Sequence, residues 1–182
     1  SHELRSPITR MKVALEFLAE SQAKDSLKSD IAEMETMINE ILETARMHHL
    51  HGNLKRRLIN LANLLEGILA DYLNQPPGVE AGDFPAEIEL NVDPEHVKAV
   101  FQNILTNAIK FSNPDDKPVM ISLIKQTEAI VVRILDRGIG IPPDELPFIF
   151  EPFYRVDKSR SKRTGGYGLG LSLCKTIMEA HG

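Results

Sequence analysis

The sequence predicts a helical hairpin followed by an α/β domain, a two-layer sandwich with helices on one face of a sheet. A heptad pattern of apolar residues up to about residue 50 predicts the hairpin. Alternating strand-like segments and amphipathic helices after residue 55 predict the α/β domain. The 182 residues carry a net charge of −5. This balance argues against nucleic acid as the main partner, because phosphate backbones select basic surfaces.

Two apolar seams define the hairpin. The first contains Leu4, Ile8, Met11, Leu15 and Leu18, and the second contains Leu27, Ile31, Met34, Ile38, Ile41 and Ala45. Polar residues 20–26 between them predict a loop, so residues 1–50 form an antiparallel pair of helices. A lone hairpin leaves half of each seam exposed to water, which predicts a four-helix bundle built from two chains. Packing of the hairpin on its own α/β domain is the alternative.

Residues 51–57 are predicted to be a linker, and residues 58–182 the second domain. The single Cys174 excludes an internal disulfide and suits a reducing compartment. No apolar run reaches the roughly 20 residues of a membrane span. We therefore expect a cytoplasmic fragment without membrane contact. The sequence lacks an initiator Met, which suggests a piece of a longer protein.

The elements of the second domain follow from local signals. Asn60 is expected to cap a helix over residues 61–72, and residues 75–85, rich in Pro and Gly, predict a loop. The alternation over residues 87–92 predicts a half-buried strand. Asp93 and Pro94 then supply an N-cap and a first-turn proline for the next helix. Residues 119–125 and 129–135 predict two strands, and residues 169–179 the last helix.

Candidate functional residues begin at the N-terminus. His2 stands beside Glu3 at the expected start of a helix, and the heptad frame places it off the apolar seam. A neutral imidazole is a nucleophile near pH 7, and a neighbouring carboxylate can take up the proton that it releases. A solvated surface histidine is the alternative interpretation.

A polar stripe marks the helix after Asp93. Asn103, Asn107 and Lys110 are spaced at i, i+4 and i+7, beside the apolar face. Amide oxygens can bind a hydrated Mg²⁺, and a lysine can neutralise phosphate oxygens. On its own, this helix is better explained as an ordinary amphipathic edge.

Two glycine-rich segments follow. Asp136 ends a strand, where its carboxylate can accept the amino group of adenine, and Gly138 and Gly140 let the backbone pass close to the ring. Gly166, Gly168 and Gly170 lead into the last helix, whose N-terminal N–H groups suit a phosphate. Residues 142–164 between them, with a basic cluster that includes Arg155 and Arg160, predict a nucleotide lid; a solvated charged loop is the alternative.

Five segments together resemble the sensor histidine kinases of two-component systems. In the order of that family they are residues 1–7 (SHELRSP, the H box), 102–111 (QNILTNAIKF, the N box), 136–142 (DRGIGIP, the G1 box), 150–155 (FEPFYR, the F box) and 166–171 (GYGLGL, the G2 box). The resemblance implies a HisKA-type dimerisation and phosphotransfer hairpin and a Bergerat or GHKL-type ATP-binding domain. It also implies more helix before His2 and a closing β-hairpin after the last helix, so we expect a C-terminally truncated catalytic domain.

The resemblance assigns roles to these residues. His2 is implied to be the phosphoacceptor for ATP, with Glu3 as its proton acceptor and a receiver-domain aspartate of a response regulator as the next recipient. Thr9, Arg10 and Val13 are implied to lie on the face that meets this regulator. Asn103 is implied to bind Mg²⁺, and Asn107 and Lys110 the phosphates. Phe111 and Asp136 are implied to lie at the adenine, and Arg155 and Arg160 at the γ-phosphate.

Two residue types refine the expected chemistry. Related ATPases of the gyrase, Hsp90 and MutL type carry a glutamate at the position of Asn103 to activate water, and an amide cannot act as that base. Ser6 replaces the Thr or Asn that the family usually has four residues after the histidine, and it leaves response-regulator phosphatase activity open. The alternatives are an ATPase clamp of the GHKL type and a catalytically impaired dimeric fragment or adaptor.

Overall fold

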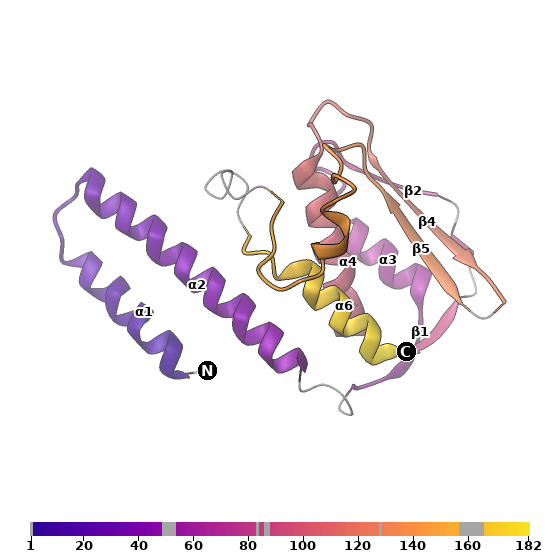
Figure 1. Cartoon of the computed structure of the whole chain (residues 1–182), viewed down its shortest axis with the longest axis horizontal. Coiled ribbons are helices and arrows are strands. Elements are labelled where there is room, and N and C mark those ends of the chain that lie inside the picture. The colour runs from indigo at the N-terminus through magenta and orange to yellow at the C-terminus, as the bar shows by residue number, and fades with distance from the viewer. Residues whose placement is uncertain (1, 49–53, 83, 86–87, 128, 157–165) are drawn as a thin grey trace. The chain divides into compact units, whose positions relative to one another are not determined.

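The computed structural model describes residues 2–48, 54–82, 84–85, 88–127, 129–156 and 166–182. Within the first two helices it describes the side chains of residues 6–39, 41 and 42. The chain divides into two compact units, Ser1–His49 and Leu50–Gly182 (Figure 1). None of the described helices is long and apolar enough to cross a bilayer.

The first unit is the predicted hairpin of α1 (His2–Glu16) and α2 (Gln22–His48). Ile8 and Leu15 of α1 pack against Ile31 of α2, and all three side chains are buried. These heptad positions therefore form the contact between the helices, as predicted, whereas the seam residues Leu18, Leu27 and Met34 stay 44–50% exposed. The loop is shorter than residues 20–26, because the Ser21 hydroxyl accepts a hydrogen bond from the Lys24 N–H and α2 begins at Gln22.

The second unit contains two small sheets and three helices among its described residues. The antiparallel pair β1 (Arg57–Asn60) and β3 (Glu89–Val92) forms one sheet. The other has the order β2 (Val79–Ala81), β4 (Val119–Lys125) and β5 (Ile130–Leu135), with β2 parallel and β5 antiparallel to β4. The helices are α3 (Leu61–Leu69), α4 (Pro94–Phe111) and α6 (Gly170–His181), and a short 3-10 turn, η1, covers Leu146–Phe148.

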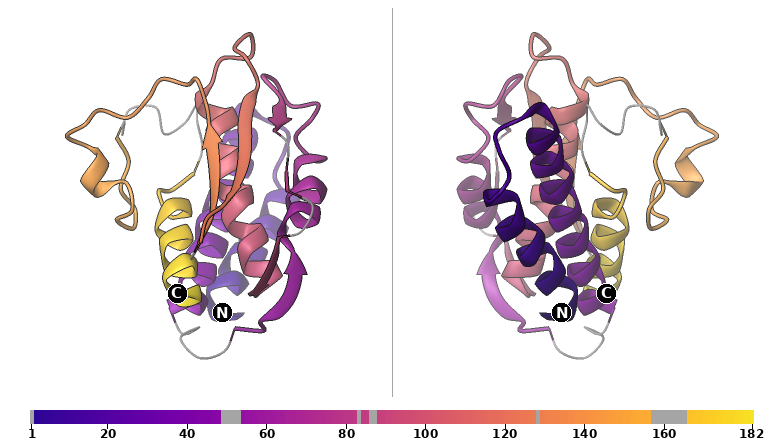
Figure 2. Two further views of the ribbon diagram at one scale, coloured as in Figure 1. Left: turned by 90° about the vertical axis from the view of Figure 1, so that its right-hand side faces the viewer. Right: turned by 90° about the vertical axis from the view of Figure 1, so that its left-hand side faces the viewer.

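Helices α3 and α4 cover one face of the larger sheet (Figure 2). Leu65 and Ile68 of α3, Leu105 of α4 and Val119 and Ile121 of β4 belong to one core and are almost completely buried. Alternate residues of β4 point into this core because successive side chains of a strand lie on opposite faces. The predicted two-layer sandwich is confirmed.

Several predicted caps and bounds are also confirmed. Asn60 Oδ1 accepts from the Asn63 N–H at 3.0 Å, and Asp93 Oδ1 accepts from the N–H groups of Glu95 and His96. Strand β4 has the predicted bounds, and β5 begins one residue later than expected. Helix α3 ends at Leu69, three residues before the predicted end, although Tyr72 still reaches the core.

Two predictions about the second unit were wrong. The predicted loop over residues 75–85 contains strand β2, which pairs with β4. Arg57, which the sequence assigned to the linker, is the first residue of β1 and pairs with Val92. Both strands are short, and their backbone pairs with segments that are distant in sequence. Local composition therefore gives little sign of either.

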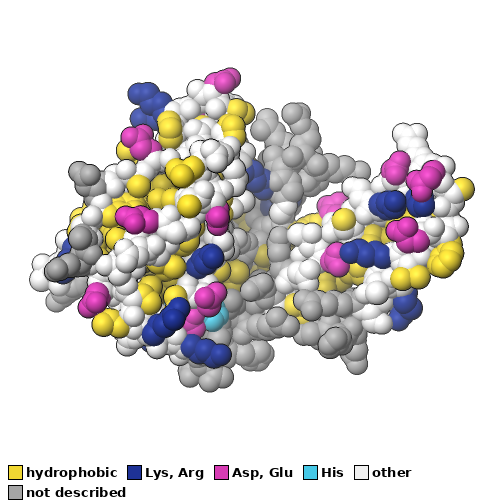
Figure 3. Space-filling model, turned by 180° about the vertical axis from the view of Figure 1, so that it is seen from behind, with side chains coloured by type: hydrophobic (Ala, Val, Ile, Leu, Met, Phe, Trp, Pro, Cys, Tyr) yellow, Lys and Arg dark blue, Asp and Glu magenta, His cyan; other side chains and the backbone are white. Residues whose placement is uncertain are grey.

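The surface shows no segregation of charge on the face seen in Figure 3. Acidic and basic side chains are interspersed among apolar ones over both units. This distribution agrees with the modest net charge of −5.

Candidate functional site

The N-terminal candidates lie on α1. His2 and Glu3 are in its first turn, but their side chains lie outside the described part of the structure. The Ser6 side chain is exposed, and its Oγ accepts a hydrogen bond from Arg10 Nη1 at 2.9 Å. Thr9, Arg10 and Val13 are exposed as well. The predicted partner face after His2 is therefore open to solvent in a single hairpin.

The polar stripe of α4 is partly buried and ordered by its own helix. Asn103 Nδ2 donates to the Ala99 carbonyl at 3.0 Å, so the amide is held by its own helix. A Cβ placed on Gly170 would lie only 2.8 Å from Asn103 Oδ1. The absence of a side chain at position 170 therefore lets α6 begin close to this amide. Asn107 and Lys110 continue the stripe toward the C-terminus of α4.

The segment after β5 lies against the last residue of α4. The Ile139 N–H donates to the Phe111 carbonyl at 3.2 Å, and a Cβ on Gly138 would approach that oxygen to 2.5 Å. Asp136 Oδ1 accepts from the Gly138 N–H at 2.9 Å, so the carboxylate is held at the end of the strand. Asp136, Gly138 and Phe111, the predicted adenine residues, are therefore neighbours.

The second glycine segment lies against Lys110, the residue before Phe111 in α4. A Cβ on Gly166 would lie 3.4 Å from Lys110 Nζ, and that ammonium stands 5.0 Å from the centre of the Phe111 ring. Gly166 and Gly168 have φ values of 85° and 77°, in the region that favours glycine. Gly140 of the first segment also has a positive φ, 70°. Helix α6 starts at Gly170, directly after the glycines, as predicted.

Residues on either side of the segment 157–165 are bonded to each other. Arg155 donates through Nη1 to the Gly166 carbonyl, and the Phe153 N–H donates to the Gly168 carbonyl at 3.0 Å. A Cβ on Gly168 would meet the Tyr154 carbonyl oxygen at 2.5 Å. Arg155 is thus placed beside the glycine segment that also contacts Lys110. Arg160, the other predicted γ-phosphate residue, lies outside the described residues.

Tyr154 and Glu145 are a pair that the sequence analysis did not identify. The Tyr154 hydroxyl donates to the Glu145 carboxylate, and its ring lies 5.5 Å from that of Phe148, centre to centre. The hydrogen bond to Glu145 raises the pKa of Tyr154, because it favours the protonated phenol. This pair therefore holds Tyr154, the residue before Arg155 in the chain, in place. The resemblance to the F box included Tyr154, but nothing in its spacing indicated Glu145 as a partner.

The structure therefore brings most of the predicted nucleotide residues together at the C-terminal half of α4. Gly170 meets Asn103, Gly166 meets Lys110, and Gly138 meets Phe111. The Asp136 carboxylate, the Lys110 ammonium group, the Asn103 amide and the N-terminus of α6 therefore lie along this part of α4 and its two glycine segments. Among the described residues no group of three His, Cys, Asp or Glu side chains could hold a metal ion. The predicted Mg²⁺ ligand is the amide oxygen of Asn103, which lies beside the start of α6. Its fixed orientation and hard donor atom suit Mg²⁺.

This fold and this set of residues define a nucleotide-binding α/β domain of the GHKL type that follows a histidine-bearing helical hairpin. Residues 92–182 match the family model of histidine kinase-, DNA gyrase B- and HSP90-like ATPases. Residues 1–50 match the model of the His Kinase A phospho-acceptor domain. The chain belongs to this ATPase family and, within it, to the sensor histidine kinases of two-component systems.

Individual relatives agree with this assignment. The chain is 33% identical over 195 aligned positions to the sensor protein kinase WalK of Staphylococcus aureus, covering all of this chain and 46% of that protein. WalK of the strain JH9 gives the same identity, with 32% of its length covered. The chain thus spans less than half the length of these curated relatives.

Solved structures share the fold. Full-length ShkA in complex with AMPPNP has a TM-score of 0.75 at 20% identity, with 98% of this chain and 39% of that chain covered. The histidine kinase AdeS of Acinetobacter baumannii has a TM-score of 0.66 at 22% identity, with 99% and 87% covered. The fold predicted from the sequence is therefore that of histidine kinases.

Proposed function

We propose that this chain catalyses ATP-dependent autophosphorylation of His2 and then transfers the phosphoryl group to an aspartate of a response regulator. The observation that carries the proposal is the contact of three glycines from two segments with Asn103, Lys110 and Phe111. These contacts create a site for a nucleoside triphosphate within one unit of a chain whose other unit carries His2 beside Glu3.

In the proposed reaction a ring nitrogen of His2 attacks the γ-phosphorus of ATP. The new N–P bond forms as the bond between that phosphorus and the β,γ-bridging oxygen breaks, and ADP leaves. Glu3 accepts the proton from the other ring nitrogen, so that the phosphohistidine is neutral at the imidazole. A carboxylate oxygen of a receiver aspartate then attacks the phosphorus, the N–P bond breaks as the new O–P bond forms, and Glu3 returns its proton to the ring, which regenerates neutral His2. Phosphoryl transfer demands mostly positioning and charge neutralisation from the protein.

The residues of the second unit supply that positioning. Asp136 accepts the adenine amino group, and the absence of a Cβ at Gly138 lets the segment after β5 lie against the Phe111 carbonyl. Lys110, Asn107 and the N–H groups at the start of α6 bind phosphate oxygens. Arg155, held beside the Gly166 carbonyl, is placed to reach the terminal phosphate. We propose Asn103 as a protein ligand of Mg²⁺, which when bound would neutralise charge on the phosphates.

Asn103 also favours transfer to His2 over hydrolysis. An amide cannot remove a proton from water at neutral pH, so this position offers no general base for attack on ATP by solvent. ATP bound at such a site survives until the histidine attacks.

We infer that the partners are a second copy of the chain and the receiver domain of a response regulator. Ile8, Leu15 and Ile31 of the seam are buried within one hairpin, whereas Leu18, Leu27 and Met34 remain 44–50% exposed. A second hairpin would cover these side chains in a four-helix bundle. The exposed face at Thr9, Arg10 and Val13 is proposed to meet the regulator, and we place the fragment in the cytoplasm, where ATP is available.

The test is incubation of the chain with γ-labelled ATP. We expect acid-labile, base-stable label on the wild-type chain and none on His2→Ala, with nucleotide affinity unchanged in the variant. His51→Ala, which removes a histidine of the predicted linker, serves as the matched control and should retain the label. Persistent label on His2→Ala would contradict the assignment of the phosphoacceptor. Phosphate release without a phosphoprotein would instead identify an ATPase clamp, and absence of nucleotide binding a non-catalytic adaptor.

A further inference from the structure

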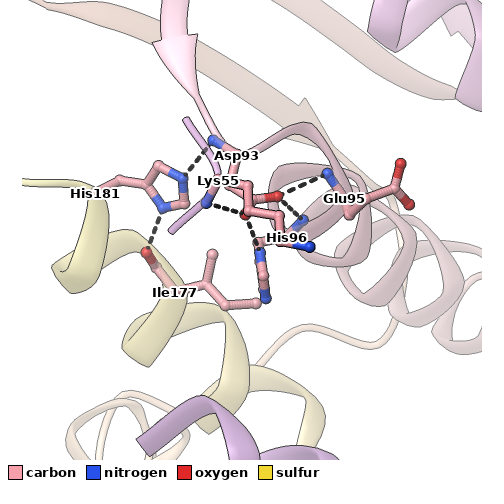
Figure 4. Close-up of polar contacts among 6 residues, drawn as sticks. All are labelled: Lys55, Asp93, Glu95, His96, Ile177 and His181. Carbon is pink, nitrogen blue, oxygen red and sulfur yellow. Dashed lines mark hydrogen bonds and ion pairs between the residues drawn. The ribbon is translucent and has the colours of Figure 1, made fainter. Parts of the chain in front are cut away.

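A buried aspartate connects three segments of the second unit that are distant in sequence, through its carboxylate and its backbone N–H. Asp93 is only 3% exposed and caps the N-terminus of α4 (Figure 4). Its Oδ2 accepts from the Lys55 N–H at 2.8 Å and lies 2.9 Å from His96 Nδ1. Burial alone raises the pKa of Asp93, but the adjacent His96 ring and the backbone N–H groups of Lys55 and His96 outweigh it, and the pKa lies below its ordinary value. The carboxylate is therefore a stable anionic acceptor for the backbone of Lys55.

His181, at the end of α6, completes the connection. The Asp93 N–H donates to His181 Nε2 at 3.0 Å, and His181 Nδ1 lies 2.8 Å from the Ile177 carbonyl. Because Nε2 accepts, the neutral ring must carry its proton on Nδ1, which donates to Ile177. Figure 4 shows the imidazole between the last turn of α6 and the start of α4. Its two nitrogens join the C-terminal end of one helix to the N-terminal end of the other.

Arg56 attaches the incoming chain to the same helix end. Its Nη2 donates to the carbonyls of Ala180 and His181 at 2.9 and 3.1 Å. These carbonyls belong to the last turn of α6, where a cation also interacts favourably with the helix dipole. Lys55 and Arg56 are therefore fixed to α4 and α6 respectively. The polypeptide connection from the first unit, which ends at His49, enters the second unit through this segment.

The same two helices meet again at the nucleotide site. Asn103 of α4 lies against Gly170, the first residue of α6. Asp93 precedes Asn103 by ten residues, which corresponds to about 15 Å along a helix. Helices α4 and α6 therefore contact each other at two places. One is at the nucleotide residues, and the other is at Asp93, His181 and Arg56.

We propose that Asp93, His181 and Arg56 form an anchor that holds Lys55 and Arg56, the start of the second unit, against helices α4 and α6. Through this anchor the three act as positioning residues for phosphoryl transfer to His2. The inference depends on the proposed autophosphorylation. Loosening the anchor leaves the nucleotide contacts of α4 and α6 in place, but it lets the backbone at Lys55 and Arg56 adopt other directions. The fraction of time that a histidine meets the γ-phosphate then falls, while ATP binding is retained.

The test compares kcat and KM for ATP in autophosphorylation by the full chain. For Arg56→Ala and His181→Ala we expect kcat to fall about tenfold or more, since small misplacements of reacting groups have effects of this size. The KM for ATP should stay within about twofold of wild type, since the nucleotide contacts are untouched. His181→Gln, which restores an acceptor for the Asp93 N–H, should recover most of the rate. Arg57→Ala is the matched control, because it removes the same charge from an exposed neighbouring side chain.

The outcomes separate this inference from the proposed function. Wild-type kcat in both Ala variants would overturn the anchor while leaving autophosphorylation intact. A rise in KM that parallels the fall in kcat, with early thermal unfolding, would assign these residues a purely structural role and would also overturn it. A wild-type chain that binds ATP but forms no phosphohistidine would reject the proposed function and the anchor with it.

Discussion

Glycine at position 138 decides how closely the first glycine segment approaches α4. A Cβ there would lie 2.5 Å from the Phe111 carbonyl oxygen and 2.9 Å from its carbon, so backbone must move to admit a methyl group. For Gly138→Ala we expect nucleotide affinity to fall about tenfold or more, with a loss of about 1–3 kcal/mol in stability from overpacking. Isothermal titration with an ATP analogue and thermal unfolding measure the two effects.

Gly67→Ala provides the control for this substitution. Gly67 lies inside α3, and a Cβ there meets nothing within 4 Å. The added methyl group should therefore stabilise the second unit by about 0.5–1 kcal/mol through helix propensity and leave nucleotide binding unchanged. Equal nucleotide affinities in the two glycine variants would contradict the assignment of Gly138 to the nucleotide site.

The sequence predicts which residues lie close together where a single helix or a single turn determines their relative positions. Asn103, Asn107 and Lys110 share one side of α4 because their spacing follows the helical repeat. The contact between Asp93 and His181, by contrast, joins residues 88 positions apart. The pairing of Tyr154 with Glu145 depends on the path of the chain around η1. No local periodicity encodes such contacts.

At the scale of elements, the turn of the hairpin depends on a buried lysine. Lys24 is 4% exposed, and its ammonium donates to the Leu18 carbonyl at 2.9 Å and to Glu20 at 2.6 Å. The hydrogen bond from the Lys24 ammonium and the positive charge of that group hold the pKa of Glu20 below its ordinary value. The ammonium thus satisfies a carbonyl just beyond the end of α1 while its aliphatic stem fills the turn.

Lys24→Met should destabilise the hairpin. Methionine keeps much of the apolar stem but leaves the Leu18 carbonyl without its donor, which costs about 1–3 kcal/mol. Amide hydrogen exchange of α1 and α2 in the full chain measures the change locally, and Lys117→Met, at an exposed position of the other unit, is the control. Because Glu20 has a lowered pKa, its contribution is present above its unfolded pKa and lost as pH falls through the folded value. The difference between Lys24→Met and wild type should therefore shrink on acidification, and a constant difference would contradict a role for the Glu20 pair.

Elements were predictable in proportion to their length and periodicity. Helix α4, with 18 residues and a capping Asp-Pro pair, was evident from the sequence, as was strand β4 with its seven residues. Strands β1 and β2 have four and three residues and expose half or more of their side chains. Their pairing with β3 and β4 is a property of the assembled sheets and overrides weak local signals.

At the scale of the whole molecule, the apolar residues left exposed on the hairpin indicate its assembly. Phe17, Leu18, Leu27 and Met34 are between 44% and 85% exposed in a hairpin in which Ile8, Leu15 and Ile31 are buried. Exposed apolar side chains of this number on two short helices mark an interaction surface. A second copy offers the same heptad pattern, so the proposed four-helix bundle would use each of these residues twice about a two-fold axis.

Leu27→Glu tests this assembly. Burial of a leucine contributes about 2 kcal/mol, and two symmetry-related copies contribute about 4 kcal/mol, before any cost of burying the new carboxylate. The dissociation constant of the dimer should therefore rise about a thousandfold. Sedimentation equilibrium at several protein concentrations measures the change, and Leu73→Glu, at a 60% exposed position of the other unit, is the matched control. A wild-type chain that stays monomeric at high concentration, or a Leu27→Glu chain that remains as dimeric as Leu73→Glu, would show that something other than a second hairpin covers the exposed seam.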